Sequence, residues 1–195
     1  MQFQQAKDFI VKKLSDELPP KLSYHSIVHI NDVYSACERL AGEEGVTGES
    51  LLLLLTAALY HDSGFLVQSK GHEILSCDIA RQHLPGFQYN VEEVAAICAM
   101  IMATKLPQTP KNKLEEILCD ADLDYLGRDD FYQVGNRLYN EFCTEGIVSG
   151  EKEWNRVQLE FLQAHHYFTD TAIKLRKPKK DDHLRQIRSK VEIYS

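Results

Sequence analysis

The length and composition of the chain indicate one soluble globular domain. Of its 195 residues, 44% are hydrophobic and 26% are charged, values close to those of ordinary globular proteins, which argues against a disordered chain. The longest strongly apolar run, at about 51–60, covers only half of a bilayer. Gly and Pro are scarce, with 10 and 6 residues, which disfavours a sandwich of many short strands.

The charge is uneven along the chain. The formal net charge is −7, yet eight of the 22 Lys and Arg residues lie between Lys174 and Lys190, where only two residues are acidic. The remaining acidic body argues against binding to a nucleic-acid polymer. We interpret the basic segment as a solvated helix rather than a site for a polyanion.

The cysteines and the N-terminus indicate a cytoplasmic protein. The five cysteines are odd in number and form no CxxC pair, which is typical of reduced core thiols. The first residues lack the basic region and apolar run of a secretory signal. We therefore expect no membrane partner and a cytoplasmic location.

Helical periodicity runs through almost the whole chain, and no segment alternates as a strand does. We therefore predict an all-α fold, a single compact domain of about eight to ten helices over residues 1–195. A short helix is expected behind Thr169 and a loosely packed terminal helix beyond Pro178. The preceding helices are expected at about 3–17, 24–40, 51–60, 72–83, 91–104, 113–126, 129–143 and 151–168.

A histidine and an aspartate stand at the end of the most apolar helix. The segment 51–60 is apolar nearly all round, which predicts a central, buried helix, and it runs directly into His61 and Asp62. Burying a lone carboxylate costs several kcal/mol, because it loses its hydration, unless a cation or a hydrogen-bond network compensates. A metal ion would supply that compensation; a helix cap or turn followed by Ser63 and Gly64 is the alternative.

Two further segments carry groups of the same kind. His25 and His29 are four residues apart and would share one face of a helix. Near residue 120, Asp122 has leucines four residues before and after it, so we expect it to face the core. Asp120 and Asp124 are expected on the polar face. An ion pair with Arg128 or Lys105 is the alternative role for Asp122.

These residues occur in a recognisable order. His29, then His61 and Asp62, then Asp122, on successive helices of an all-helical chain, resembles the HD superfamily of metal-dependent phosphohydrolases. The resemblance covers about residues 22–128, which would form the HD metal-binding core, with C-terminal helices at 129–195. Its most specific segments are 59–64 and 24–33, the latter similar to a segment of cyclic-nucleotide phosphodiesterases.

The resemblance implies a ligand set and further roles. A divalent metal ion, with Mn, Mg, Co, Ni, Fe and Zn not distinguished, would be held by His29, His61, Asp62 and Asp122. Such an ion activates water and neutralises phosphoryl charge. His25 would protonate the leaving oxygen, against a packed or outer-shell histidine as the alternative, and Asp62 would bridge a second ion or orient the attacking water.

Other polar residues are assigned less specific roles. His72, at the start of a helix, would bind a second metal or the phosphate, with a surface histidine as the alternative. Lys105 could reach a phosphate, although a lysine at a helix C-terminus is favoured by the dipole anyway. Surface or core positions are expected for Glu73, His83, His165 and His166.

The sequence therefore predicts a metal-dependent phosphohydrolase, a phosphatase or phosphodiesterase, acting on a small phosphorylated metabolite, with a nucleotide as the favoured class. A homodimer is left open. One alternative is a non-catalytic module that senses a nucleotide with the same pocket. Another is a di-iron oxygenase of the same fold, which would need extra histidines, of which only His72 is well placed.

Overall fold

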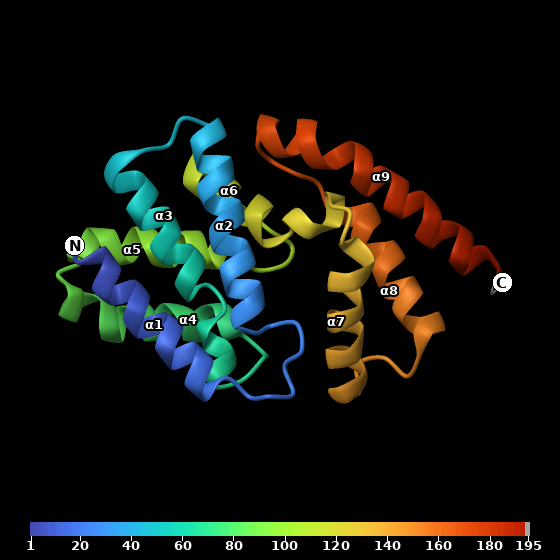
Figure 1. Cartoon of the computed structure of the whole chain (residues 1–195), viewed down its shortest axis with the longest axis horizontal. Helices are drawn as coiled ribbons and strands as arrows, with labels where there is room; N and C mark the ends of the chain where they lie inside the picture. The colour runs from blue at the N-terminus through green and yellow to red at the C-terminus, as the bar shows by residue number, and fades with distance from the viewer. Residues whose placement is uncertain (194–195) are drawn as a thin grey trace.

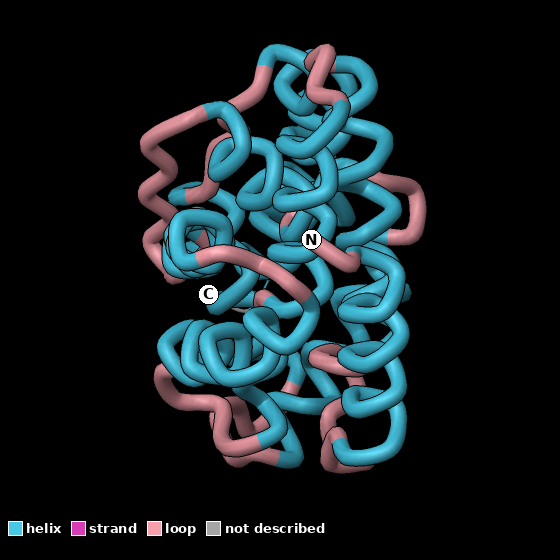
Figure 2. The backbone as a smooth tube through the Cα atoms, turned by 90° about the vertical axis from the view of Figure 1, so that its left-hand side faces the viewer, coloured by secondary structure: helices cyan, strands magenta, loops and turns pink. Residues whose placement is uncertain are grey.

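The computed structural model describes residues 1–193, and all regular structure in that range is helical (Figures 1 and 2). This confirms the predicted all-α class. The helices are α1 (Phe3–Glu17), α2 (Ile27–Glu43), α3 (Gly48–Tyr60), α4 (His72–His83), α5 (Val91–Ala103), α6 (Lys113–Asp122), α7 (Phe131–Thr144), α8 (Glu151–Ala164) and α9 (Asp170–Ile193), with short 3-10 helices η1 (Ser63–Leu66), η2 (Leu84–Phe87) and η3 (Asp124–Gly127).

Most helix ends lie where local signals place them. Helix α1 ends just before the two prolines at 19 and 20, and α5 begins at a capping box in which Asn90 and Glu93 bond each other's backbone amides. Helix α2 differs from the prediction: it begins at Ile27 because Ser26 is extended and forms its N-cap. His25 therefore precedes the helix, and the expectation that it shares a helix face with His29 is wrong.

The C-terminal helix also differs from the prediction. A short helix and a separate, loosely packed one were expected, but α9 is one helix that passes through Pro178. It packs closely, with Ala172, His183 and Ile187 buried, and the His183 ring nitrogen Nδ1 lies 2.9 Å from the carbonyl oxygen of Leu126. These contacts along its length compensate for the single backbone hydrogen bond that proline removes.

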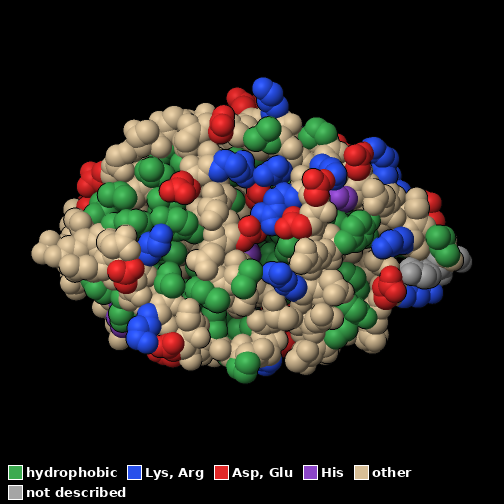
Figure 3. Space-filling view, in the orientation of Figure 1, with side chains coloured by type: hydrophobic (Ala, Val, Ile, Leu, Met, Phe, Trp, Pro, Cys, Tyr) green, Lys and Arg blue, Asp and Glu red, His purple; other side chains and the backbone are tan. Residues whose placement is uncertain are grey.

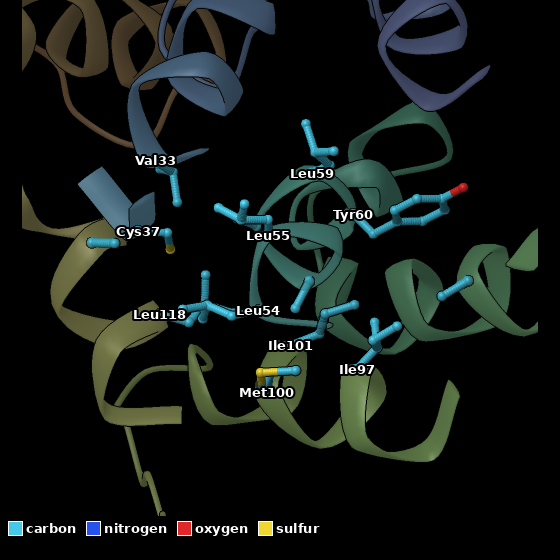
Figure 4. Packing of buried hydrophobic residues seen from close by; sticks show 14 of the residues in the cluster. Val33, Cys37, Leu54, Leu55, Leu59, Tyr60, Ile97, Met100, Ile101 and Leu118 are labelled. Carbon is cyan, nitrogen blue, oxygen red and sulfur yellow. The ribbon is translucent and has the colours of Figure 1, made fainter. Parts of the chain in front are cut away.

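The main core surrounds α3, as its apolar sequence predicts. Figure 4 shows Leu54, Leu55, Leu59 and Tyr60 of α3 among side chains from α2, α5 and α6, and these four residues are at most 3% exposed. The second half of α3, from Leu54 to Tyr60, is thereby enclosed on all sides. Its C-terminal end, where His61 and Asp62 follow, is fixed inside the protein.

Two parts lie side by side along the long axis in Figure 1. We call α1 to α6 the N-terminal part and α7 to α9 the C-terminal part. A second, smaller core joins Phe131, Leu162 and Ile187 of the C-terminal part to residues of the chain before α7, among them Tyr24 and Tyr125. At the boundary, Gly127 lets α9 approach closely, because a Cβ there would lie 2.3 Å from the carbonyl oxygen of Arg176.

Charged side chains also join the two parts. Figure 3 shows Lys, Arg, Asp and Glu side chains gathered over the middle of one face. The buried Asp124 accepts hydrogen bonds from Arg39 of α2 at 2.8 Å and from Arg176 of α9 at 2.7 Å. The two arginines thus share one carboxylate across the boundary. Among the helices between residues 1 and 193, none combines the length and apolar character of a membrane span.

Candidate metal centre

Four side chains from three helices converge at the boundary of the two parts. His29 comes from α2, His61 and Asp62 follow α3, and Asp122 is the last residue of α6. The Nε2 atom of His29 lies 3.3 Å from Asp62 Oδ2 and 3.2 Å from Asp122 Oδ1. The Nε2 atom of His61 lies 3.3 Å and 3.5 Å from the same two oxygens. The two imidazole nitrogens are 3.4 Å apart.

This arrangement fits a single divalent ion. Ligand atoms that each lie about 2.0–2.2 Å from one ion are roughly 3.0–3.5 Å from one another, as the His–His pair and the four His–Asp pairs are. Two imidazole nitrogens and two carboxylate oxygens form a donor set that suits transition metals. His29, His61 and Asp122 form a group that could hold a metal ion, and Asp62 Oδ2 lies 3.3 Å from each of the two imidazole nitrogens.

The electrostatics of the cluster favour a cation. Burial opposes the charged form of His29, but hydrogen bonds to Asp122 and Asp62 raise its pKa to about 9. Burial opposes ionisation of Asp62 and Asp122 as well, yet the facing imidazoles hold the pKa of each carboxyl well below its ordinary value. The carboxylates thus attract positive charge to this point, which a metal ion would supply in place of protons.

Backbone contacts orient the cluster. The Nδ1 atom of His61 lies 2.8 Å from the carbonyl oxygen of Ala58, so Nδ1 carries the proton and Nε2 is left for a metal. After Asp62, Gly64 packs directly on the start of α4, where a Cβ would lie 2.0 Å from the carbonyl oxygen of His72. Its amide donates to Ser76 Oγ at 2.8 Å. The glycine therefore allows Asp62 and His72 to approach.

His72 lies beside the cluster, as its predicted role at a second metal or the phosphate requires. Its Nε2 atom is 3.2 Å from Asp62 Oδ1, the carboxylate oxygen that faces away from His29 and His61. Its Nδ1 atom lies 3.0 Å from the carbonyl oxygen of Ser69. Glu73 is buried, with its Oε1 atom 3.9 Å from His72 Nε2. It therefore lies at the site, although only a surface or core position was expected for it.

His25 reaches the site from the loop before α2. Its ring stacks on Phe65, with ring centroids 4.0 Å apart, and its Nδ1 atom makes a short hydrogen bond with Glu141 of α7. The other oxygen of Glu141 accepts from the backbone amides of Tyr24 at 2.9 Å and His25 at 3.1 Å. Burial would raise the pKa of Glu141, but the hydrogen bond from His25 lowers it. A buried carboxylate therefore fixes the histidine.

Sequence reasoning missed Glu141. It is separated from His25 by 116 positions, and nothing in the local sequence connects the two. The one available signal is its place on α7 between Leu138 and Phe142, among positions that face the cavity. An acidic residue there is 3% exposed, and buried carboxylates need partners.

The cluster opens into a cavity of about 590 Å³. His25, Asp62, His72 and Asp122 line it, whereas His29 and His61 lie behind. Lys105 also lines the cavity, beyond the end of α5, and its side chain is exposed. The structure thus brings His25, His72 and Lys105 to the same space as the candidate ligands.

The orientations predicted for the three aspartates near residue 120 are partly wrong. Asp120 and Asp124 were expected on a polar, solvated face, but they are 0% and 2% exposed. The C-terminal part covers that face: Asp120 accepts from the amide and hydroxyl of Thr169 at 2.8 and 2.7 Å. Asp122 instead faces the cavity. Arg128, its alternative partner, bonds Asp32 and Asp130.

The remaining histidines lie away from the cluster. His83 packs on Phe9 of α1, with ring centroids 4.7 Å apart. His165 follows α8 with Nδ1 3.2 Å from the ammonium nitrogen of Lys180, and His166 is exposed. None of the three lines the cavity beside Asp62 and Asp122.

The fold and the cluster together define an all-α domain whose histidine and aspartate side chains could hold a divalent metal ion. The chain belongs to the HD domain family, whose model matches residues 27–124. This family lies within a superfamily of metal-dependent phosphohydrolases, so the resemblance found in the sequence is confirmed.

One solved structure has the same fold. It is the crystal structure of a predicted HD superfamily hydrolase from an uncultured Thermotogales bacterium, and it is 18% identical to this chain. The match covers 98% of this chain and 92% of that one, with a TM-score of 0.63. At this identity the likeness establishes the fold alone. No curated protein matches the chain.

Proposed function

We propose that the protein is a metal-dependent phosphohydrolase acting on a small phosphorylated metabolite, with a nucleotide as the favoured class. His29, His61, Asp62 and Asp122 would be the metal ligands. This proposal rests on the convergence of four donor atoms at a cavity that His25 also lines. The His–Asp and His–His distances among these atoms are 3.2–3.5 Å. The absence of nucleic-acid and membrane partners and a cytoplasmic location stay predictions.

The chemistry divides between the ion and the side chains. A bound divalent ion would lower the pKa of a water molecule and neutralise charge on phosphoryl oxygens. The protein contributes positioning, which phosphoryl transfer mainly requires. As the water oxygen bonds to phosphorus and the ester bond breaks, His25 would give a proton from Nε2 to the leaving oxygen. Its Nδ1 atom is held by Glu141, which fixes the ring for that transfer.

Other residues would hold the substrate and the water. Asp62 presents Oδ2 to the two imidazoles and Oδ1 to His72, so it would orient the attacking water or bridge to a second ion. Lys105 lines the cavity and has no ion pair to another residue between 1 and 193. Its ammonium group would attract a phosphate at the rim.

Metal analysis combined with a phosphate-release assay tests the proposal. Purified protein should hold at least one divalent ion and should release phosphate or a phosphomonoester from nucleotides with added Mn²⁺, Mg²⁺ or Co²⁺. Asp62→Ala should remove both the metal and the activity, whereas Asp16→Ala on the exposed face of α1 should change neither. Unchanged metal content in Asp62→Ala would refute the ligand set.

Two other results would identify a different activity. Binding of a nucleotide without turnover, measured in a single-turnover experiment with equimolar ligand, would indicate a sensing module. Iron-dependent oxygen uptake without phosphate release would indicate an oxygenase, for which His72 beside Asp62 would be the extra histidine.

A further inference from the structure

Two cysteines face each other across the interface between α4 and α5. Helix α4 packs on α5 (Figure 1), and Cys77 of α4 and Cys98 of α5 are 1% and 4% exposed. The sulfur of Cys77 lies 3.4 Å from the carbonyl oxygen of Cys98, and the sulfur of Cys98 lies 3.7 Å from the carbonyl oxygen of Cys77. Neither residue lines the cavity at the metal centre. The proposed function therefore leaves this pair without a role.

The two thiols differ in acidity. A hydrogen bond between them lowers the pKa of Cys98 to about 7, although burial opposes that shift, and raises the pKa of Cys77. Burial raises the pKa of the other two buried thiols, Cys37 and Cys119. Oxidants react with the thiolate form of cysteine. Cys98 is therefore the most reactive of the four buried thiols, and the sulfur to which it could bond is already beside it.

The pair lies beneath a thin cover of surface side chains. Asp78 and Arg81, on the same helix as Cys77, have side chains that are 61% and 58% exposed, and both act electrostatically on the two thiols. The positive charge of Arg81 favours the thiolate of each cysteine. Hydrogen peroxide is little larger than water, so it can pass between such side chains.

We propose that Cys77 and Cys98 are a redox-modification site, which hydrogen peroxide converts into a disulfide between α4 and α5. In the first step the Cys98 thiolate attacks one peroxide oxygen. An S–O bond forms, the O–O bond breaks, and the departing hydroxide takes up the proton that Cys98 had lost, giving water. In the second step Cys77 gives up its proton, its sulfur bonds to the sulfenic sulfur of Cys98, and the second oxygen leaves with that proton as water. Two thiols are thus oxidised by two electrons, and one peroxide is reduced to two waters.

The disulfide would join two elements of the cavity wall. Helix α4 begins with His72 and Glu73, and the chain continues from the end of α5 to Thr104 and Lys105, and these four residues line the cavity. A covalent bond of about 2.05 Å between the sulfur atoms would restrain α4 against α5. The disulfide also removes entropy from any state in which the two helices separate. Oxidation should therefore make this wall of the cavity more rigid.

Mass spectrometry of the full chain tests the proposal. Reduced protein should carry five thiols that can be alkylated after unfolding. Native protein treated with equimolar hydrogen peroxide should lose two of them, yield a cross-linked peptide that joins Cys77 to Cys98, and regain both thiols with dithiothreitol. Absence of this peptide even with excess peroxide, or another pair in its place, would overturn the proposal.

Oxidation in urea is the matched control, because the unfolded chain no longer holds the two thiols together. It should give a mixture of cysteine pairs, whereas native protein should give one. The same mixture from native protein would show that the fold does not position this pair, and the proposal would be wrong.

Serine variants test the order of the two steps. A serine hydroxyl can still donate to the facing carbonyl oxygen, so the interface is kept. In Cys77→Ser the reaction should stop at a sulfenic acid on Cys98, which dimedone traps. In Cys98→Ser, dimedone should trap at least about tenfold less on Cys77, because a thiol with a raised pKa stays protonated. Equal trapping in the two variants would overturn the assigned order.

Two further measurements complete the test. Cys143→Ser removes the exposed thiol and should leave the disulfide unchanged; loss of the disulfide in this variant would contradict the assigned pair. Hydrogen exchange of the α4 amides should be slower in oxidised than in reduced protein, and should not change when Cys77→Ser is treated with peroxide. Equal exchange in oxidised and reduced protein would refute the restraint of the cavity wall.

Discussion

The N-terminal and C-terminal parts contribute different things to one cavity. All four proposed metal ligands come from the N-terminal part. They lie on α2, at the end of α6 and directly after the central α3. The C-terminal part supplies Glu141, which fixes His25, and apolar walls of the cavity such as Leu138 and Trp154. The HD model covers residues 27–124 and so matches the first contribution and not the second.

This difference separates metal binding from the use of the substrate. In the N-terminal part, side chains are fixed by a large apolar core and by short backbone contacts such as that of His61. In the C-terminal part, the contributions to the cavity come from the cavity-facing sides of α7 and α8. Changes at the four proposed ligands of the first part should therefore alter the metal content, and changes in the second part should alter turnover or selectivity with the metal retained.

The two histidines of the 24–33 segment give the largest expected effect. His29→Ala should lose the metal. His25→Ala should keep the metal and the fold but lose about 10²–10⁴ in kcat, the usual contribution of a positioned acid. The loss should be smaller for nitrophenyl esters, which need little protonation of the leaving group. Loss of metal from His25→Ala would mean that His25 is itself a metal ligand and not the acid.

Glu141 tests the contribution of the C-terminal part. Glu141→Gln should lower kcat about 10–100-fold, as loss of an orienting carboxylate commonly does, and leave the metal content unchanged. The loss should be smaller for nitrophenyl esters, because Glu141 acts through the proton that His25 would give to the leaving oxygen. Glu145→Gln, one turn further on at the exposed C-cap of α7, is the control. An equal loss for natural and nitrophenyl esters would indicate a merely structural role.

The pH dependence of metal binding should sharpen the comparison further. Because the pKa of His29 is raised to about 9 in the metal-free protein, this imidazole carries a proton below that pH, and metal binding must displace it. Affinity should therefore rise with pH up to about 9, by about tenfold per pH unit for each displaced proton. Titration calorimetry in buffers of different ionisation enthalpy would count the protons. Constant affinity across this range would contradict the proposed ligand role of His29.

The sequence predicts the N-terminal contribution better than the C-terminal one. The ends of α1 and α4 follow from local signals, and His61 and Asp62 are identified by their place after an apolar helix. Such signals lie within a few residues of the features they predict. The start of α2 depended instead on a single N-cap at Ser26, which moved His25 out of the helix.

Long-range packing explains what could not be predicted. The burial of Asp120 arises because Thr169, 49 positions away, bonds its carboxylate, and no periodicity within α6 encodes that contact. The continuation of α9 through Pro178 likewise depends on its packing against η3, through residues such as His183. The cavity walls on α7 and α8 were predicted only as parts of helices, since the residues on the other side of the cavity come from a different part of the chain.

The link from Glu141 back to Tyr24 and His25 has a consequence for the order of assembly. Chains are synthesised from the N-terminus and tend to fold in that direction. The four proposed metal ligands are synthesised by the end of α6, before Glu141. A growing chain that ends there contains every proposed metal ligand, while the loop that carries His25 is still unanchored. On the proposed function, such an incomplete chain would bind metal without cleaving phosphate esters.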